Sequence, residues 1–401
     1  MQKNQKLSAH QHVRERTHLE FLNNSAAIAE PERSAAYENT STASLERSQT
    51  TNASRTKYLV YVSFQDDDAI SIFRMDPSTG QLSWQQSVSV AGGPAPLATD
   101  HRNNFLYVGK RNTHELSSFR IDRLSGNLTS VGTVPLQGEP IQLITDRTGR
   151  FVLSAYFYQS TAAVHAVNGD GMITFPPVEW LYTAKGAHAI YTDRSNRFVF
   201  VPHVANRGGP NAIFQFTFDE NTGRLTPNAV PHLSLEKYLG PRHLCFHPTL
   251  DVVYSSDEQG SSVTGYYLDT TVGTLTSFQT ISTVPDTYTE KHPYSCSQIQ
   301  ISPSGRFLFI PTRGHNSVAS FAIDRSTGKL TATGRVFTEP TPRAFSLDPS
   351  GRFLLVAGRE SGRLAAYQVN QDNGELVPLE TYDGGNTPMW VLITTLPEQD
   401  D

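Results

Sequence analysis

A pattern that returns seven times between residues 57 and 396 limits this chain to very few folds. Each copy has a short apolar strand and then a second strand that ends in a turn with a glycine. The first copy reads KYLVYVS and FRMDPSTGQL, and the last reads GRFLLVA and YQVNQDNGEL. Successive turn glycines are 46, 45, 52, 50, 55 and 46 residues apart, and they are Gly80, Gly126, Gly171, Gly223, Gly273, Gly328 and Gly374. Seven such units of β-branched and aromatic strands predict an all-β fold, a seven-bladed β-propeller.

A third apolar segment indicates how the ring closes. Such a segment precedes every copy except the first, as in GGPAPLATD and GPRHLCFHP. The last one, TPMWVLIT, has no copy after it. We therefore expect residues 387–394 to return to blade one and pair with its strands. This pairing joins the two ends of the ring and removes an exposed sheet edge.

Composition separates the chain into two parts and excludes several classes of partner. Residues 1–56 are rich in Ser, Thr, Asn, Gln and Glu, which predicts a disordered polar tail before the propeller domain of residues 57–396. A net charge of −5 gives no support for a nucleic-acid partner. No apolar run approaches the roughly 18–20 residues that span a membrane. With only Cys245 and Cys296, a disulfide framework is excluded and a cytoplasmic location is favoured.

Aligning the repeats brings several polar side chains to one end of the central channel. The third segments are expected to be the innermost strands, and one level of them holds Ala95, Ile141, His188, Arg242, Ser297, Arg343 and Met389. The next strand is antiparallel, so its C-terminal end reaches the same face of the ring. The corresponding positions beyond that strand are Gln65, Arg111, Phe157, Val204, Glu258, Arg313 and Arg359.

The two alignments together predict a site for a small anion. One arginine at a strand end can simply bridge neighbouring blades. Five arginines, one histidine and a single acid around one channel mouth are harder to explain as fold maintenance, because buried like charges without partners cost several kcal/mol. No His/Cys spacing is typical of a zinc site, so we predict neither a metal nor a cofactor. The predicted set is His188, Arg242, Glu258, Arg313, Arg343, Arg111 and Arg359.

Four segments also carry a resemblance to a known family. GPRHLCFHP, YSSDEQGSSV, TPRAFSLDPSGRFLLVAG and TPMWVLIT resemble the lactonase family of seven-bladed propellers, over about residues 57–396. The resemblance implies a polar site at His188, Arg242, Glu258 and Arg313, with Arg343 a further member. The chain departs from the family pattern at Asp257, where Asn is usual, and at Ala189, where Ser is common. Arg111 and Arg359 come from the repeat alignment alone.

The resemblance implies hydrolysis of a sugar-acid lactone that bears a negative group, such as 6-phosphoglucono-1,5-lactone. We expect Arg242 and Arg313 to stabilise the oxyanion that forms when water attacks the carbonyl. Glu258 would orient this water with His188 as its partner, and either group is a candidate base. The remote anionic group would be held by Arg343, Arg111 or Arg359.

Three other interpretations remain open at this point. A lactonizing enzyme of the carboxymuconate type would use the same arginines for a carboxylate and run the ring chemistry in reverse. A non-catalytic propeller scaffold would bind protein through its rim loops and would tolerate the loss of Glu258. A calcium-dependent lactonase propeller is disfavoured, because the aligned residues are basic where calcium needs oxygen ligands.

Overall fold

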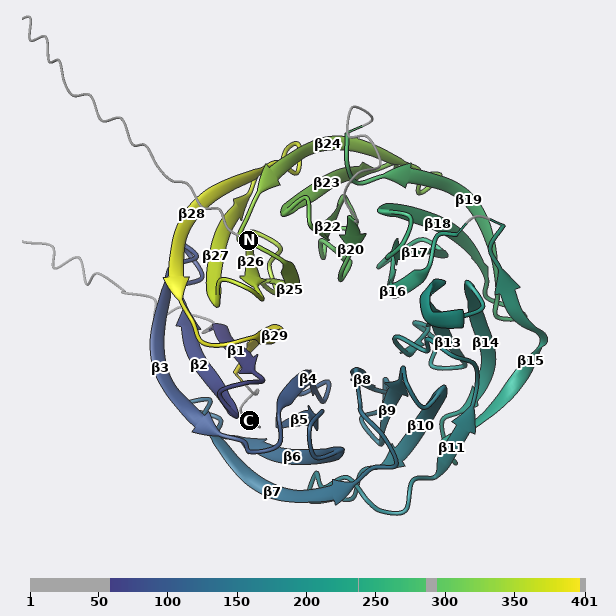
Figure 1. Ribbon diagram of the computed structural model, residues 1–401, viewed down its shortest axis with the longest axis horizontal. Coiled ribbons are helices and arrows are strands. Elements are labelled where there is room, and N and C mark those ends of the chain that lie inside the picture. The colour runs from purple at the N-terminus through teal and green to yellow at the C-terminus, as the bar shows by residue number, and fades with distance from the viewer. Residues whose placement is uncertain (1–57, 237, 286–293, 397–401) are drawn as a thin grey trace, which may run out of the picture. The chain divides into compact units, whose positions relative to one another are not determined.

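The computed structural model describes residues 58–396, except residue 237 and residues 286–293. Seven antiparallel sheets follow one another around a central channel (Figure 1). The prediction of an all-β, seven-bladed β-propeller is therefore confirmed. The predicted polar tail, residues 1–56, lies outside the described residues and stays a prediction. No helix in the described part of the chain is long and apolar enough to cross a membrane.

The first three blades contain strands β29 and β1–β11. Blade one consists of β29 (Pro388–Thr395), β1 (Tyr58–Phe64), β2 (Ala69–Met75) and β3 (Leu82–Ser89). Blade two consists of β4 (Pro94–Thr99), β5 (Phe105–Lys110), β6 (Glu115–Ile121) and β7 (Leu128–Pro135). Blade three consists of β8 (Gln142–Thr145), β9 (Phe151–Tyr156), β10 (Thr161–Ala166) and β11 (Glu179–Tyr182).

The other four blades contain strands β12–β28 and one short 3-10 helix. Blade four consists of β12 (Tyr191–Thr192), β13 (Phe198–His203), η1 (Asn206–Gly208), β14 (Ala212–Asp219) and β15 (Arg224–Ser234). Blade five consists of β16 (Pro241–Phe246), β17 (Val252–Asp257), β18 (Ser262–Asp269) and β19 (Thr274–Ser282). Blade six consists of β20 (Ser295–Cys296), β21 (Gln300–Ile301), β22 (Phe307–Arg313), β23 (Ser317–Ile323) and β24 (Leu330–Phe337). Blade seven consists of β25 (Pro342–Leu347), β26 (Phe353–Gly358), β27 (Arg363–Val369) and β28 (Leu376–Asp383).

The last strand closes the ring as the repeat pattern predicted. Strand β29 lies antiparallel to β1, with Val391 opposite Val62 and Ile393 opposite Val60. The third segments of the repeats do form the innermost strands, which surround the channel (Figure 1). Closure matters for function because it holds seven inner strand ends in a fixed circle.

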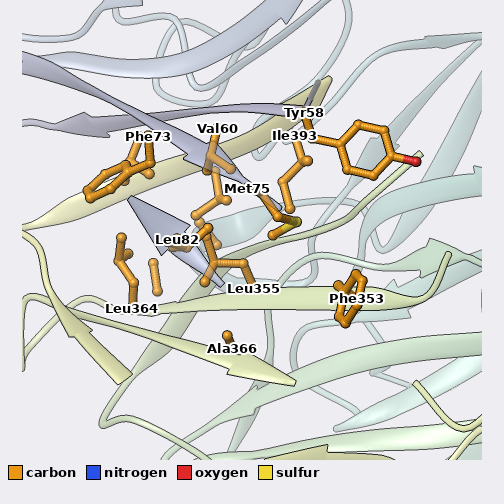
Figure 2. Close-up of a cluster of buried hydrophobic side chains, with 14 of the residues drawn as sticks. Tyr58, Val60, Phe73, Met75, Leu82, Phe353, Leu355, Leu364, Ala366 and Ile393 are labelled. Atoms are coloured by element: carbon orange, nitrogen blue, oxygen red, sulfur yellow. The ribbon is translucent and has the colours of Figure 1, made fainter. Parts of the chain in front are cut away.

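The hydrophobic core lies between neighbouring blades. At the junction of blades seven and one, Val60 and Phe73 pack with Leu355 and Leu364 (Figure 2). Strand β1 is buried throughout, whereas in the outer strand β3 only Leu82 is buried and the other residues are partly or fully exposed. Each inner or middle strand meets a neighbouring blade on both faces, whereas the outermost strand faces solvent on one side. This difference in burial explains why the inner strands of each repeat are the apolar ones.

The repeated turn glycines are required by this packing. Gly80 has a φ of +75°, and a Cβ atom on it would lie 2.4 Å from the ring of Phe353 in the neighbouring blade. Gly171 meets Phe105 in the same way, at 2.1 Å. Any larger residue would be strained at this φ and would also displace an aromatic side chain of the next blade. The glycine spacing therefore indicates blade-to-blade contacts as well as hairpins.

Candidate active site

The structure brings all seven predicted residues to one cavity of about 330 Å³ at one end of the central channel. Three of them stand on or just before inner strands, and the other four end the following strand or begin the loop after it. They are His188, Arg242 and Arg343, and then Arg111, Glu258, Arg313 and Arg359. The seven side chains that the repeat alignment placed at this end therefore line one cavity, and their chemical roles stay a prediction.

Glu258 is the centre of the charged contacts. It directly follows β17, where its backbone N–H donates to the carbonyl of Gly240 at 2.7 Å. Its Oε2 lies 2.7 Å from Arg242 Nε and 3.5 Å from an Nη of Arg313. The same oxygen is 3.9 Å from His188 Nε2. One carboxylate thus faces two guanidinium groups and one imidazole.

Two of the guanidinium groups lie deeper in the cavity wall, with Arg242 buried and Arg343 partly buried. Arg242 is 2% exposed, and burial lowers its pKa to about 10, an effect that Arg313 increases and Glu258 opposes. For Arg343, burial and then the charges of Arg242 and Arg313 hold the pKa well below its usual value. In the described part of the chain, the guanidinium of Arg343 forms neither an ion pair nor a hydrogen bond. It is therefore a cation that lacks a counter-ion at the cavity wall.

The remaining arginines differ in how firmly the protein holds them. Arg313 donates to the carbonyl of Cys296 at 3.0 Å, which fixes its guanidinium beside Glu258. Arg111 forms an ion pair with Glu139 and is partly exposed. Arg359 is exposed at the rim. Glu258 is the one acid that lines the cavity, as the repeat alignment predicted, and Glu139 pairs with Arg111 from outside it.

His188 lies in a strongly positive environment beside Glu258. Burial comes first, and then the charges of Arg242 and its neighbours lower its pKa well below the usual value. The imidazole is therefore neutral at pH 7. Its Nδ1 is buried and has no hydrogen-bond partner among the described residues. Its ring centroid lies 6.0 Å from that of Phe157 and 5.3 Å from that of His243.

Sequence reasoning missed part of the cavity wall. Tyr158, Asn206 and Arg207 also line the cavity, and Arg207 is a sixth guanidinium there. Two of them, Asn206 and Arg207, lie on the segment VANRGGPNA, residues 204–212, which is longer than its counterparts in the other repeats. Because the other blades have no equivalent of this insertion, an alignment of repeats could not place its side chains. The length of the loop was the only available signal.

The charges of the wall determine what the cavity can bind. Six arginines and one glutamate line it, which favours an anionic ligand with several oxygen acceptors. Within the described ranges, no group of three or more His, Cys, Asp or Glu side chains is placed to hold a metal ion. The arrangement is suited to stabilising negative charge that develops near Glu258 and Arg242.

Comparison with known proteins assigns this chain to a family. The model of the lactonase, 7-bladed beta-propeller family matches residues 60–393. The chain belongs to this family. A 6-phosphogluconolactonase of Yersinia pseudotuberculosis serotype O:3 is 32% identical over 337 residues, which is 84% of this chain and 98% of that protein. A 6-phosphogluconolactonase of Pectobacterium carotovorum is 32% identical over 62% of this chain and 72% of its own length.

Solved structures of other proteins share the fold. The periplasmic gluconolactonase of Pseudomonas aeruginosa superimposes with a TM-score of 0.78 over 85% of this chain and all of that one, at 22% identity. A putative 6-phosphogluconolactonase of Bacteroides fragilis gives 0.77 over 86% of this chain and 99% of that one, at 20% identity. At this level of identity the likeness concerns the fold, and the chemistry is argued from the side chains of this chain.

Proposed function

We propose that this protein hydrolyses 6-phosphoglucono-1,5-lactone to 6-phosphogluconate. The observation that carries the proposal is the excess of guanidinium groups around one carboxylate in a cavity of about 330 Å³. Such a cavity fits a small anionic substrate. The names of the lactonase-family relatives, which match over most of this chain, support the same substrate. The reaction is one step of sugar-phosphate oxidation, and the two free cysteines, Cys245 and Cys296, support a cytoplasmic location.

The carbonyl end of the lactone would bind next to Arg242. When water attacks, a bond forms between the water oxygen and the carbonyl carbon, and negative charge develops on the carbonyl oxygen. Arg242 is already ordered by Glu258 at 2.7 Å and lies in a buried setting where its charge is poorly screened. Arg313 is fixed nearby by the carbonyl of Cys296. Loss of one such donor typically raises the barrier by about 2.7–4 kcal/mol.

His188 and Glu258 divide the proton chemistry. His188 is neutral, so its imidazole can accept the proton of the attacking water. Glu258 is held by two guanidinium groups and would orient the same water with Oε2, 3.9 Å from His188 Nε2. When the ring C–O bond breaks, the ring oxygen takes up the proton that His188 accepted and becomes a hydroxyl. The product acid then ionises and releases the proton gained from water.

The phosphate would bind across the cavity from the base. Arg343 and Arg359 both come from blade seven, which lies across the ring from blade four, where His188 stands (Figure 1). Arg343 has no internal counter-ion in the described structure, so a phosphate would supply the missing negative charge. Arg111, on blade two, is shared with Glu139 and would contribute less. A bound substrate would thus be aligned between two separate groups of side chains.

The direct test is ring opening of freshly generated 6-phosphoglucono-1,5-lactone above its spontaneous rate. We expect acceleration by the wild type, and at least a hundredfold loss in Arg242→Ala and in Glu258→Ala. Arg306→Ala, which removes a partly exposed arginine that lies outside the cavity, is the matched control and should keep full activity. Circular dichroism confirms folding of each variant. An inactive wild type would refute the proposal, and carboxymuconate-type lactones would then be tested.

A further inference from the structure

One loop of the cavity face differs from its six counterparts. In each blade a short loop joins the second strand from the channel to the third. It has three or four residues in six blades, and eight in blade four, residues 204–211. This longer loop carries Asn206 and Arg207 to the cavity wall. An insertion that occurs in one blade only, and that reaches the site, indicates a role that the ring itself does not need.

The loop is held in one shape by its own backbone. Arg207 has a φ of +52°, in the left-handed region that residues other than glycine seldom adopt. A Cβ atom on Gly209 would lie 1.9 Å from the carbonyl oxygen of Val204, so only glycine fits there. These constraints make the loop turn back on itself and fix where Arg207 leaves the backbone.

Contacts on both sides connect the loop to the site. The backbone N–H of Ala205 donates to Oε1 of Gln259 at 2.9 Å, and Gln259 directly follows Glu258. On the other side an Nη of Arg207 donates to the hydroxyl oxygen of Tyr158 at 3.1 Å, and its guanidinium lies 5.7 Å from the ring centroid. Tyr158 in turn packs on Phe157, 5.1 Å away between centroids, and Phe157 packs on His188. The Arg207–Tyr158 pair therefore stands on the same side of the cavity as the proposed base.

The polar atoms of this pair point to a particular ligand chemistry. Tyr158 uses its oxygen to accept from Arg207, which leaves its O–H proton free to donate. Arg207 has five N–H donors, of which one is used. Both side chains are exposed and line the cavity. Donors beside an aromatic face fit the hydroxyl oxygens of a sugar ring, which a muconate-type lactone lacks.

We propose that loop 204–211 is a specificity element, in which Arg207 and Tyr158 select lactones that carry ring hydroxyls. This inference rests on the proposed lactonase function and identifies the part of the substrate that is read near the base. Arg343 and Arg359 hold the charged end from blade seven, and the Arg207–Tyr158 pair reads the hydroxyl groups. A site built to bond a hydroxyl discriminates strongly against an analogue without it.

The test measures coupling between Arg207 and single hydroxyls of the substrate. Wild type and Arg207→Ala are compared on 6-phosphoglucono-1,5-lactone and on its 2-deoxy, 3-deoxy and 4-deoxy analogues. We expect kcat/KM of the wild type to fall about tenfold to a hundredfold for at least one analogue. In Arg207→Ala that penalty should shrink to about threefold or less, because the partner of the hydroxyl is gone. Tyr158→Phe should show the same coupling to a smaller extent.

Arg359→Ala is the matched control, since it removes another exposed guanidinium from the same cavity wall. It should lower kcat/KM for all four substrates by the same factor. If Arg207→Ala and Tyr158→Phe also lose activity uniformly across the series, the specificity role is refuted and the loop only supports the wall. A wild type without activity on the parent lactone would instead refute the proposed function, so the two failures are distinguishable.

Discussion

The two ends of the central channel are built from similar inner strands but differ in whether their buried polar side chains have hydrogen-bond partners. The end that holds Glu258 contains buried polar atoms without hydrogen-bond partners, among them Arg111 Nε, His188 Nδ1, Asn206 Oδ1 and Arg242 Nη1. The other end is a larger cavity, of about 570 Å³, whose wall includes Gln142, Gln300 and Tyr191. No residue of this wall is among those with unsatisfied buried side-chain atoms in the described structure.

The amides of the far end are occupied by the protein itself. Gln142 Oε1 accepts from the backbone N–H of Ile190 in the next blade, at 2.9 Å. Gln300 bonds the backbone of blade seven twice, accepting from Leu347 N–H at 2.8 Å and donating to the carbonyl of Phe345 at 3.1 Å. These side chains join blades, whereas those at the other end retain unused bonding capacity. The larger cavity is therefore not the better candidate for the active site, because its polar side chains already have partners within the protein.

Among substitutions that test this difference between the two ends, we expect the largest loss of activity at Arg343. We predict that Arg343→Met lowers kcat/KM for the phosphorylated lactone at least about a hundredfold, because the cavity loses the guanidinium that lacks an internal counter-ion. The same change should raise the free energy of unfolding by about 1 kcal/mol, since it relieves repulsion from Arg242 and Arg313. Kinetics and urea unfolding measure the two effects. A variant that is both inactive and less stable would show that Arg343 supports the fold.

The matched change at the far end should give the reverse result. Gln300→Leu leaves the N–H of Leu347 and the carbonyl of Phe345 without their side-chain partner. We expect the free energy of unfolding to fall by about 2 kcal/mol, the cost of unsatisfied buried groups. At a temperature where the variant is folded, kcat/KM should stay within about twofold of the wild type. A large loss of activity with full stability would mean that the far cavity takes part in the reaction.

The sequence predicts the positions of those site residues that belong to the repeat, and it does not predict the others. Arg242 and Glu258 could be placed together because each has six aligned counterparts, and closure of the ring puts all aligned positions at one level. Arg207 could not be placed, because its loop has no counterpart. The pairing of Arg111 with Glu139 depends on side-chain direction, which repeat spacing does not determine. The amide contacts of Gln142 and Gln300 could not be predicted either, because no local sequence pattern identifies a glutamine that bonds to the neighbouring blade.

His165 tests whether an unsatisfied polar group indicates function when it lies outside the cavities. It is fully buried, and neither ring nitrogen has a hydrogen-bond partner among the described residues. Burial lowers its pKa to about 4. We predict that His165→Leu raises the free energy of unfolding at pH 7 by about 1 kcal/mol, by removing an unsatisfied group, and leaves activity unchanged.

The pH dependence of stability sharpens the test at His165. Its pKa is about 6.5 in an unfolded chain, so the unfolded state binds the proton first as pH falls. The wild type should therefore lose stability between pH 6.5 and about 4, and the advantage of His165→Leu should grow by about 2 kcal/mol between pH 7 and pH 5. Urea unfolding at both pH values measures this. A constant difference between the two proteins would mean that His165 does not titrate as a buried group.

The smallest expected effect is on the pKa of His188, the proposed base, which the arginines of the cavity lower. The pKa of His188 is lowered by burial first and then by the charges of Arg242, His243, Arg343 and Arg313. Replacing Arg343 by Met removes one positive charge, so protonation of His188 becomes easier and its pKa rises. The acid limb of kcat/KM should then move to higher pH by less than about one unit, whereas Gln300→Leu should leave it in place. Residual activity of Arg343→Met at high substrate concentration is enough for this profile. An unshifted limb would assign the acid limb to a group other than His188 and return the role of base to Glu258.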